Sequence, residues 1–126
     1  MSESLPETRY LLRRGLLSRG LTFSEEGPYT FRVETSQGVR FGISLMPGNR
    51  RIAIFHGSVV PEQLRGKGLG QKFLALREEL AHEAGINLLL ATVRDTNEPE
   101  AHILTKAGWV RLIERETGTT LWGKRI

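Results

Sequence analysis

The sequence predicts a mixed α/β fold, and three observations support this prediction. Three strand-like segments follow one another in the first half of the chain, each bounded by turn residues, which is typical of an antiparallel meander. An apolar strand, a glycine-rich turn, an amphipathic helix and a second apolar strand come next, which is the pattern of a parallel crossover. A helix and a hairpin close the chain. We therefore expect one sheet with both antiparallel and parallel neighbours.

The first predicted element is an amphipathic helix over about residues 5–19, which ends near Gly20. Its Leu pairs and four Arg residues are also found in targeting peptides. However, Glu3 and Glu7 interrupt the segment, and neither a long apolar run nor a small-residue cleavage site follows. We therefore favour a helix of the fold.

Three predicted strands come next, rich in Tyr, Phe, Val, Ile and Thr. They are YTFRVET (29–35), VRFGISL (39–45) and RIAIFHGSVV (51–60). The third has apolar side chains on both faces, with Val59 on the same face as Phe55 by simple alternation. This pattern predicts a central strand that is covered on both sides.

Helical spacing returns after the glycines, where apolar residues recur every three or four positions up to Gly85. These residues are Leu69, Phe73, Leu76, Leu80 and Ala84. The segment INLLLATV (86–93) is the second strand of the crossover. Asn97, with Glu100 three residues later, has the pattern of a capping box and predicts a final helix. The segments 109–116 and 119–125 are predicted to form the closing hairpin.

The composition is that of one globular domain, which we assign to residues 1–126. Hydrophobic residues make up 39% and charged residues 25% of the chain, as in ordinary soluble proteins. Cys is absent, which excludes a disulfide or a thiolate nucleophile and suits a cytoplasmic protein. The three scattered His residues predict no metal site. No apolar run is long enough to span a bilayer, so we expect no membrane attachment.

The net charge of +4 indicates some affinity for anions. A nucleic-acid binder would use such a charge, but the sequence has no helix-turn-helix, no aromatic stacking platform and no concentrated basic face. We therefore expect no nucleic-acid partner.

The stretch LRGKGLGQK (64–72) is the strongest local signal of a binding site. A helix that begins directly after a strand exposes unpaired N–H groups and the positive end of its dipole. Glycines let this backbone approach a ligand, and Arg65, Lys67 and Lys72 add positive charge. The pattern predicts an anion site for phosphate or pyrophosphate, with a simple tight turn as the alternative. Neither the P-loop nor the dinucleotide fingerprint matches.

The same stretch resembles the acetyl-CoA signature of the GNAT superfamily, the general amine N-acetyltransferases. The signature core R/Q-x-x-G-x-G/A is matched by Arg65, Gly68 and Gly70, and the resemblance covers about residues 50–112. The family's later segment N-…-K-x-G-F/W is matched as well, by Asn97, Lys106, Gly108 and Trp109.

The resemblance implies a mixed sheet with helices on both faces, splayed open between the segments 51–60 and 86–93. Acetyl-CoA would lie in this split as the cofactor. The pantetheine arm would pair with the backbone near Val59, and N–H groups of the glycine turn would hold the pyrophosphate. A backbone N–H near a strand bulge would polarise the acetyl carbonyl. The implied cofactor-binding residues are Val59, Val60, Leu64, Arg65, Gly66, Lys67, Gly68, Leu69, Gly70, Gln71, Asn97 and Lys106.

Three departures from the family pattern bear on catalysis. Fewer than 30 residues precede the segment 29–35, so part of the acceptor wall is expected to be missing or to come from another subunit, for example in a homodimer. Leu104 stands where many members have a Tyr that acts as acid for the departing thiolate. The strand 51–60 has no Asp or Glu to act as base.

His56 is the candidate catalytic base, because its charge can change near neutral pH. The alternative is a neutral structural His. The resemblance therefore implies an N-acetyltransferase that moves an acetyl group from acetyl-CoA to a primary amine of a small molecule or protein. The alternative is a cofactor-binding or protein-interaction module on the same fold with little catalysis.

Overall fold

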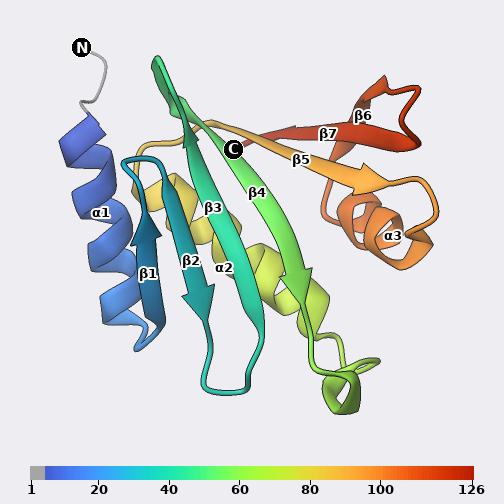
Figure 1. Cartoon of the computed structure of the whole chain (residues 1–126), viewed down its shortest axis with the longest axis horizontal. Helices are drawn as coiled ribbons and strands as arrows, with labels where there is room; N and C mark the ends of the chain where they lie inside the picture. Colours follow the sequence, from blue (N-terminus) through green and yellow to red (C-terminus); the bar gives the residue numbers. More distant parts are fainter. Residues whose placement is uncertain (1–4) are drawn as a thin grey trace.

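The computed structural model describes residues 5–126, so residues 1–4 of the predicted domain lie outside it. It has a seven-stranded sheet in the order β1-β2-β3-β4-β5-β7-β6 and three α-helices (Figure 1). The elements are α1 (Leu5–Ser18), β1 (Thr22–Glu26), β2 (Thr30–Glu34), β3 (Arg40–Met46), β4 (Asn49–Val59), the 3₁₀ turn η1 (Glu62–Leu64), α2 (Leu69–Glu83), β5 (Leu88–Arg94), α3 (Glu98–Lys106), β6 (Val110–Glu114) and β7 (Thr119–Arg125).

The pairing of the strands confirms the predicted mixed sheet. Strands β1 to β4 are antiparallel neighbours, and so are β5, β7 and β6. Strands β4 and β5 pair in parallel, with α2 as the crossover between them. The sheet therefore consists of two antiparallel parts that meet at one parallel ladder.

Strand β1 was not predicted from the sequence. Its segment TFSEE has four exposed residues out of five and pairs with β2 at the sheet edge. Two Arg side chains of α1, Arg9 and Arg13, bind the carboxylate of Glu25 on this strand. The strand lacks an apolar period because it lies at an edge, and its partners are a neighbouring strand and a charged helix face.

The helices form one layer against one face of the sheet, rather than lying on both faces as we expected. Helix α2 contacts both α1 and α3 and passes behind the sheet in Figure 1. On this face Ala53 and Phe55 are buried, whereas Ile52 and Ile54 on the opposite face are only half-buried. The opposite face carries no helix within residues 5–126, because β1 leads directly into β2 through a turn at Gly27.

A β-bulge interrupts β4 near its C-terminal end. The register moves from the pair Gly42–His56 to the pair Arg40–Val59, so β4 advances by three residues where β3 advances by two. Such an extra residue changes the face on which the following side chains lie. Val59 therefore shares the open face with His56, and the alternation that put it with Phe55 was wrong.

Candidate active site

A cleft opens where β4 and β5 diverge. Their parallel ladder runs from Ile52–Leu88 to Phe55–Ala91 and then ends, although both strands continue. A cavity of about 210 Å³ lies in this opening, between the two strand ends, α2 and α3. The split that the resemblance implied is therefore present at the expected pair of strands.

The glycine turn leads from β4 into the N-terminus of α2. Gly66 and Gly68 have φ of 79° and 74°, and a Cβ at either position would meet no other atom within 4 Å. No side chain caps α2, and its first turn contains no acidic residue. The first N–H groups of a helix have no partner inside it. The turn therefore offers open space and free donors, which fits an anionic group such as pyrophosphate.

Gly70 has a different reason to be glycine. A Cβ there would lie 2.8 Å from the terminal methyl carbon (Cδ1) of Ile103 on α3. Gly70 thus allows α2 and α3 to approach each other, whereas Gly66 and Gly68 are open to solvent.

The basic residues of the turn have separate positions. Arg65 folds back, and its Nε donates to the carbonyl oxygen of Val60 at 3.2 Å. Lys67 is exposed, and the Nζ of Lys72 lies 5.8 Å from the ring centre of Phe73. All three cations therefore lie at the surface near the helix N-terminus, and Arg65 is held against the end of β4.

The two residues predicted from the second motif lie in different depressions. Asn97 lines the cleft between β4 and β5, and its side chain also caps α3 by accepting from the N–H of Glu100 at 3.2 Å. Lys106 lies with Gln71 in a groove of about 410 Å³ between α2 and α3. Leu74 contributes to the walls of both depressions.

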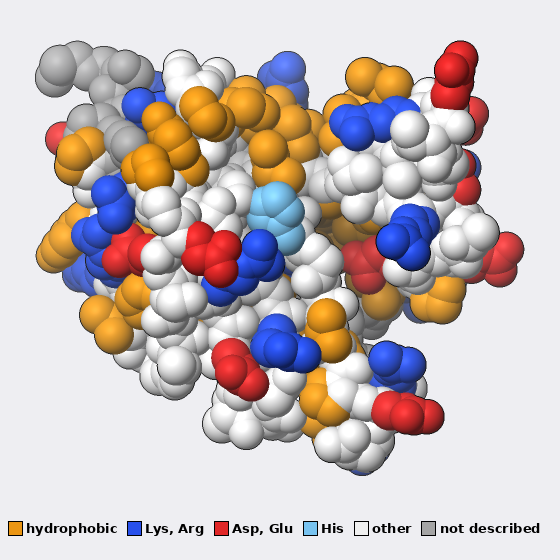
Figure 2. All heavy atoms as spheres, viewed as in Figure 1, with side chains coloured by type: hydrophobic (Ala, Val, Ile, Leu, Met, Phe, Trp, Pro, Cys, Tyr) orange, Lys and Arg blue, Asp and Glu red, His pale blue; other side chains and the backbone are white. Residues whose placement is uncertain are grey.

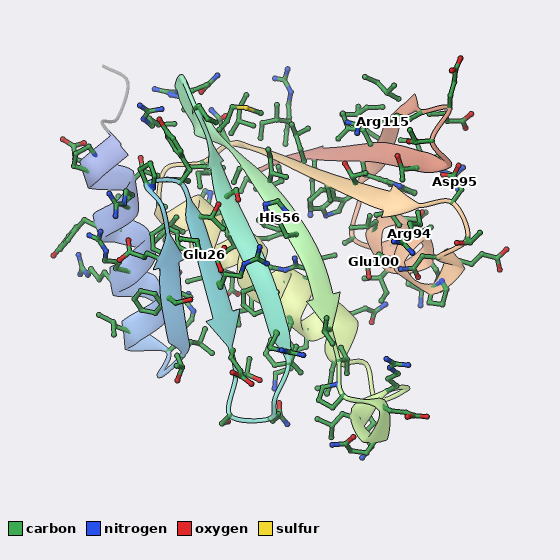
Figure 3. The ribbon with its side chains drawn as sticks, in the orientation of Figure 1. Glu26, His56, Arg94, Asp95, Glu100 and Arg115 are labelled. Carbon is green, nitrogen blue, oxygen red and sulfur yellow. The ribbon has the colours of Figure 1, made fainter. Side chains whose placement is uncertain are left out.

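His56 stands on the open face of the sheet, beside the cleft. Figure 3 shows it on the side of β4 that faces the viewer, with Arg94 and Glu100 across the opening. Its Nε2 is 2.6 Å from the Oγ of Ser44, so the two share a hydrogen bond. Partial burial, followed by the positive charges of Arg32 and Arg77, lowers the pKa of His56. The imidazole is therefore neutral near pH 7 and able to accept a proton.

Leu104 lies in the wall of the same cleft. Its side chain is 1% exposed. No Tyr is among the residues that line this cavity. The absence of a phenol at this position, which the sequence indicated, is thus not compensated by a Tyr from another described element at the cavity.

Arg77 is a residue of the cleft that the sequence prediction missed. It belongs to α2, is 3% exposed, and reaches the C-terminal part of β4. A signal was present, because Arg77 lies four residues after Phe73 and three before Leu80, on the apolar stripe of the helix. A charged residue at such a position has to find polar partners inside the protein.

Comparison with known proteins identifies the family. The acetyltransferase (GNAT) family matches residues 16–109, which is most of the chain. The chain therefore belongs to the GNAT family of acetyltransferases. The acetyl donor of this family is acetyl-CoA, and the open glycine turn and the split between β4 and β5 fit such a donor.

Solved structures share the fold at low sequence identity. A GNAT-family acetyltransferase from Streptococcus pneumoniae has a TM-score of 0.63 at 24% identity, over 77% of this chain and 65% of that one. The GNAT domain of S. lividans PAT has a TM-score of 0.65 at 16% identity, over 77% of this chain and 60% of that one. A protein from Desulfovibrio desulfuricans assigned to the GNAT acetyltransferases has a TM-score of 0.68 at 16% identity, over 99% and 96%. The chain thus spans less than two thirds of the first two. No curated protein matches it.

Within residues 5–126, no helix is long and apolar enough to cross a membrane. No group of three or more His, Asp or Glu side chains in the same part of the chain is placed to hold a metal ion.

Proposed function

We propose that this acetyltransferase moves the acetyl group from acetyl-CoA directly to a primary amine of a small molecule or protein. The observation that carries the proposal is the opening between β4 and β5, whose lining includes His56 and, from the second turn of α2, Leu74. The uncapped N-terminus of the same helix lies one turn before Leu74. A thioester in this opening would have a neutral imidazole near one end and helix N–H groups near the other.

Binding is assigned to backbone groups more than to side chains. The ends of β4 and β5 no longer pair with each other, so backbone groups that face the opening can bond to an extended ligand. The His56 carbonyl is an exception, because it already accepts from Arg77. The backbone from Leu64 to Gln71 would hold the pyrophosphate, with Lys67 and Lys72 as neighbouring cations. Asn97 would line the cleft while it also caps α3.

We assign catalysis to three contributions. These are the positioning of the thioester and the amine, the backbone N–H groups at the β4 bulge, and His56 as base. A bulge directs backbone N–H groups out of the regular ladder, and N–H groups aimed at a carbonyl oxygen stabilise the charge that develops there. His56 would accept the proton of the attacking amine, directly or through water. Its lowered pKa keeps the accepting form populated near pH 7.

The amine is expected to approach from the open face of the sheet, where His56 and Ser44 lie. No helix covers this face within the described chain, and a shallow groove over β1, β2 and β3 adjoins it. This groove has a volume of about 430 Å³ and contains Arg32, Glu34 and Arg40. A groove that is open and contains both basic and acidic side chains could admit an amine of either a small molecule or a protein.

The test has two stages. Titration calorimetry with acetyl-CoA measures binding, and thiol release across a panel of small amines and peptides measures transfer. We expect binding together with slow but measurable thiol release, because the cleft has no phenol at the position of Leu104. Failure to bind acetyl-CoA would overturn the site assignment. Tight binding without transfer to any amine would favour the alternative of a cofactor-binding module.

A further inference from the structure

Arg77 places a buried cation in the wall of the cleft. One of its terminal nitrogens donates to the carbonyl oxygen of His56 at 3.1 Å, and the other to the Oγ of Ser58 at 2.8 Å. The guanidinium carbon lies 5.3 Å from the ring centre of Phe41 and 4.8 Å from that of Phe55. The two hydrogen bonds therefore hold the guanidinium against the β4 bulge, at His56 and Ser58.

The charge of Arg77 is not neutralised by its neighbours. No carboxylate in residues 5–126 forms an ion pair with it, and its Nε is buried without a hydrogen-bond partner. Burial lowers the pKa of Arg77 to about 10, although Glu100 and Glu78 act in the opposite direction from a distance. The side chain still carries its proton at neutral pH. A buried cation without a counter-charge is costly, so the site has unused capacity for an anion.

The other charged groups around the cavity do not cancel this effect. Arg94 on β5 adds a second positive charge, Glu100 on α3 one negative charge, and His56 on β4 is neutral near pH 7. With Arg77 from α2, the lining of the cleft is net positive. Leu104 lies in the same lining, at the position where the family pattern has an acid for the departing sulfur.

We propose that Arg77 is the counter-charge for the thiolate form of CoA, in place of the acid that Leu104 cannot supply. The inference rests on the proposed function and adds to it a residue that balances the charge of the leaving group. In the transfer, the amine nitrogen bonds to the acyl carbon while the carbon–sulfur bond breaks and leaves its electron pair on sulfur. The proton of the amine passes to His56. Arg77 keeps its own proton and balances the negative charge.

The proposal is tested by the acidity of the thiol in bound CoA. Ultraviolet absorbance follows thiolate formation as pH is raised, with CoA free in solution and with CoA bound to the whole protein. A positive charge at short range lowers the pKa of an acid by about one unit or more. We therefore expect at least about a tenfold higher ratio of thiolate to thiol in the bound form at a given pH.

Two variants distinguish the effect of the positive charge of Arg77 from the effect of its hydrogen bonds to β4. Arg77→Met keeps an unbranched apolar side chain but removes the charge, and we expect the thiol of bound CoA to return to the acidity of free CoA. Ser58→Ala removes one hydrogen bond of Arg77 and keeps the charge, so the increased acidity should remain. The wild-type comparison is decisive even where Arg77→Met folds poorly.

The outcomes distinguish this inference from the proposed function. Calorimetry on the same samples shows whether CoA binds at all, and absence of binding overturns the assignment of the cleft. Binding with a thiol as weakly acidic as in free CoA leaves the cleft assignment intact and overturns the role of Arg77. The same result follows when Ser58→Ala abolishes the effect as fully as Arg77→Met, because Arg77 would then act only by bracing the strand.

Discussion

At the scale of single residues, the proposed role of His56 as a base depends on the groups that surround it. Ser44 bonds its Nε2, Gly42 lies beside its Cβ, and the charges of Arg32 and Arg77 lower its pKa. No carboxylate forms a hydrogen bond with the imidazole within residues 5–126. A neutral imidazole without an acidic partner is a weak base, and near pH 7 it is in the form that can accept a proton.

The first prediction concerns the pH dependence of transfer. The rate should rise with pH as His56 loses its proton, with a midpoint below the ordinary His pKa of about 6.5, because burial and the two Arg charges lower the pKa. His56→Gln should remove this limb and slow transfer by about a hundredfold or more. The control is His102→Gln, which changes an exposed His on α3 and should leave the limb in place.

A variant of Arg32 tests the same assignment, because the charge of Arg32 contributes to the lowered pKa of His56. Arg32→Gln removes a positive charge near His56 and should move the limb to higher pH. If the rise of the rate with pH is unchanged in both Arg32→Gln and His56→Gln, it reports the titration of another group.

A second prediction uses the space beside Gly42. A Cβ at this position would lie 3.1 Å from the Cβ of His56, which is closer than ordinary packing allows. We expect Gly42→Ala to displace the imidazole, to lower the transfer rate by up to about a hundredfold and to cost about 1–3 kcal/mol of stability through overpacking. Transfer rates and thermal unfolding measure the two effects. An unchanged affinity for acetyl-CoA is required for this explanation, since Gly42 lies outside the cleft.

At the scale of elements, the N-terminus of α2 is the part of the site that local sequence determines best. Consecutive residues build the turn, so glycine spacing and nearby charges were sufficient to predict it. The cleft beside it depends on where two distant strands stop pairing, which no local pattern encodes.

Two misses have the same physical origin. Strand β1 has four exposed residues out of five and no apolar period, so only its pairing with β2 makes it a strand. Arg77 interrupts an apolar stripe, and its role becomes clear only from the backbone oxygen and hydroxyl that it reaches on β4. Both depend on contacts between residues far apart in the sequence. The helices and the remaining strands were predicted because their patterns are contained within each segment.

The third prediction tests the N-terminus of α2 with a matched pair. Gly68→Asp and Gly68→Asn add side chains of the same shape at a φ of 74°, so they share the same backbone strain. Asp also places a negative charge beside the proposed pyrophosphate site. We expect both variants to be destabilised to a similar extent and Asp alone to lower the affinity for acetyl-CoA by a further tenfold or so. Equal affinities in titration calorimetry would contradict an anion site at this turn.

At the scale of the whole molecule, the net charge of +4 is distributed rather than concentrated. Figure 2 shows basic and acidic side chains interspersed over the visible face. Several of the basic residues are paired, among them Arg13 with Glu25, Arg19 with Glu83, and Lys124 with Glu78. The visible face therefore carries no concentrated basic patch.

A fourth prediction follows from this distribution. Binding through many phosphate contacts weakens steeply as salt is raised, whereas a ligand held largely by backbone groups should weaken far less. We expect the affinity for acetyl-CoA to change by less than about tenfold between low and physiological salt, and oligonucleotides to show no binding at physiological salt. Calorimetry with both ligands measures this difference, and an oligonucleotide complex that persists would contradict it.

The short parallel ladder between β4 and β5 has a consequence for the mechanics of the protein. Four residue pairs, from Ile52–Leu88 to Phe55–Ala91, connect the two parts of the sheet, and α2 joins them on one side. A ligand that bonds to both strand ends would act as additional rungs and stiffen this hinge. Amide protons that face the opening, in residues 57–59 and 92–94, should then exchange with solvent more slowly when acetyl-CoA is bound. Donor binding would in this way set the angle between the half of the sheet that carries His56 and the half that carries Arg94.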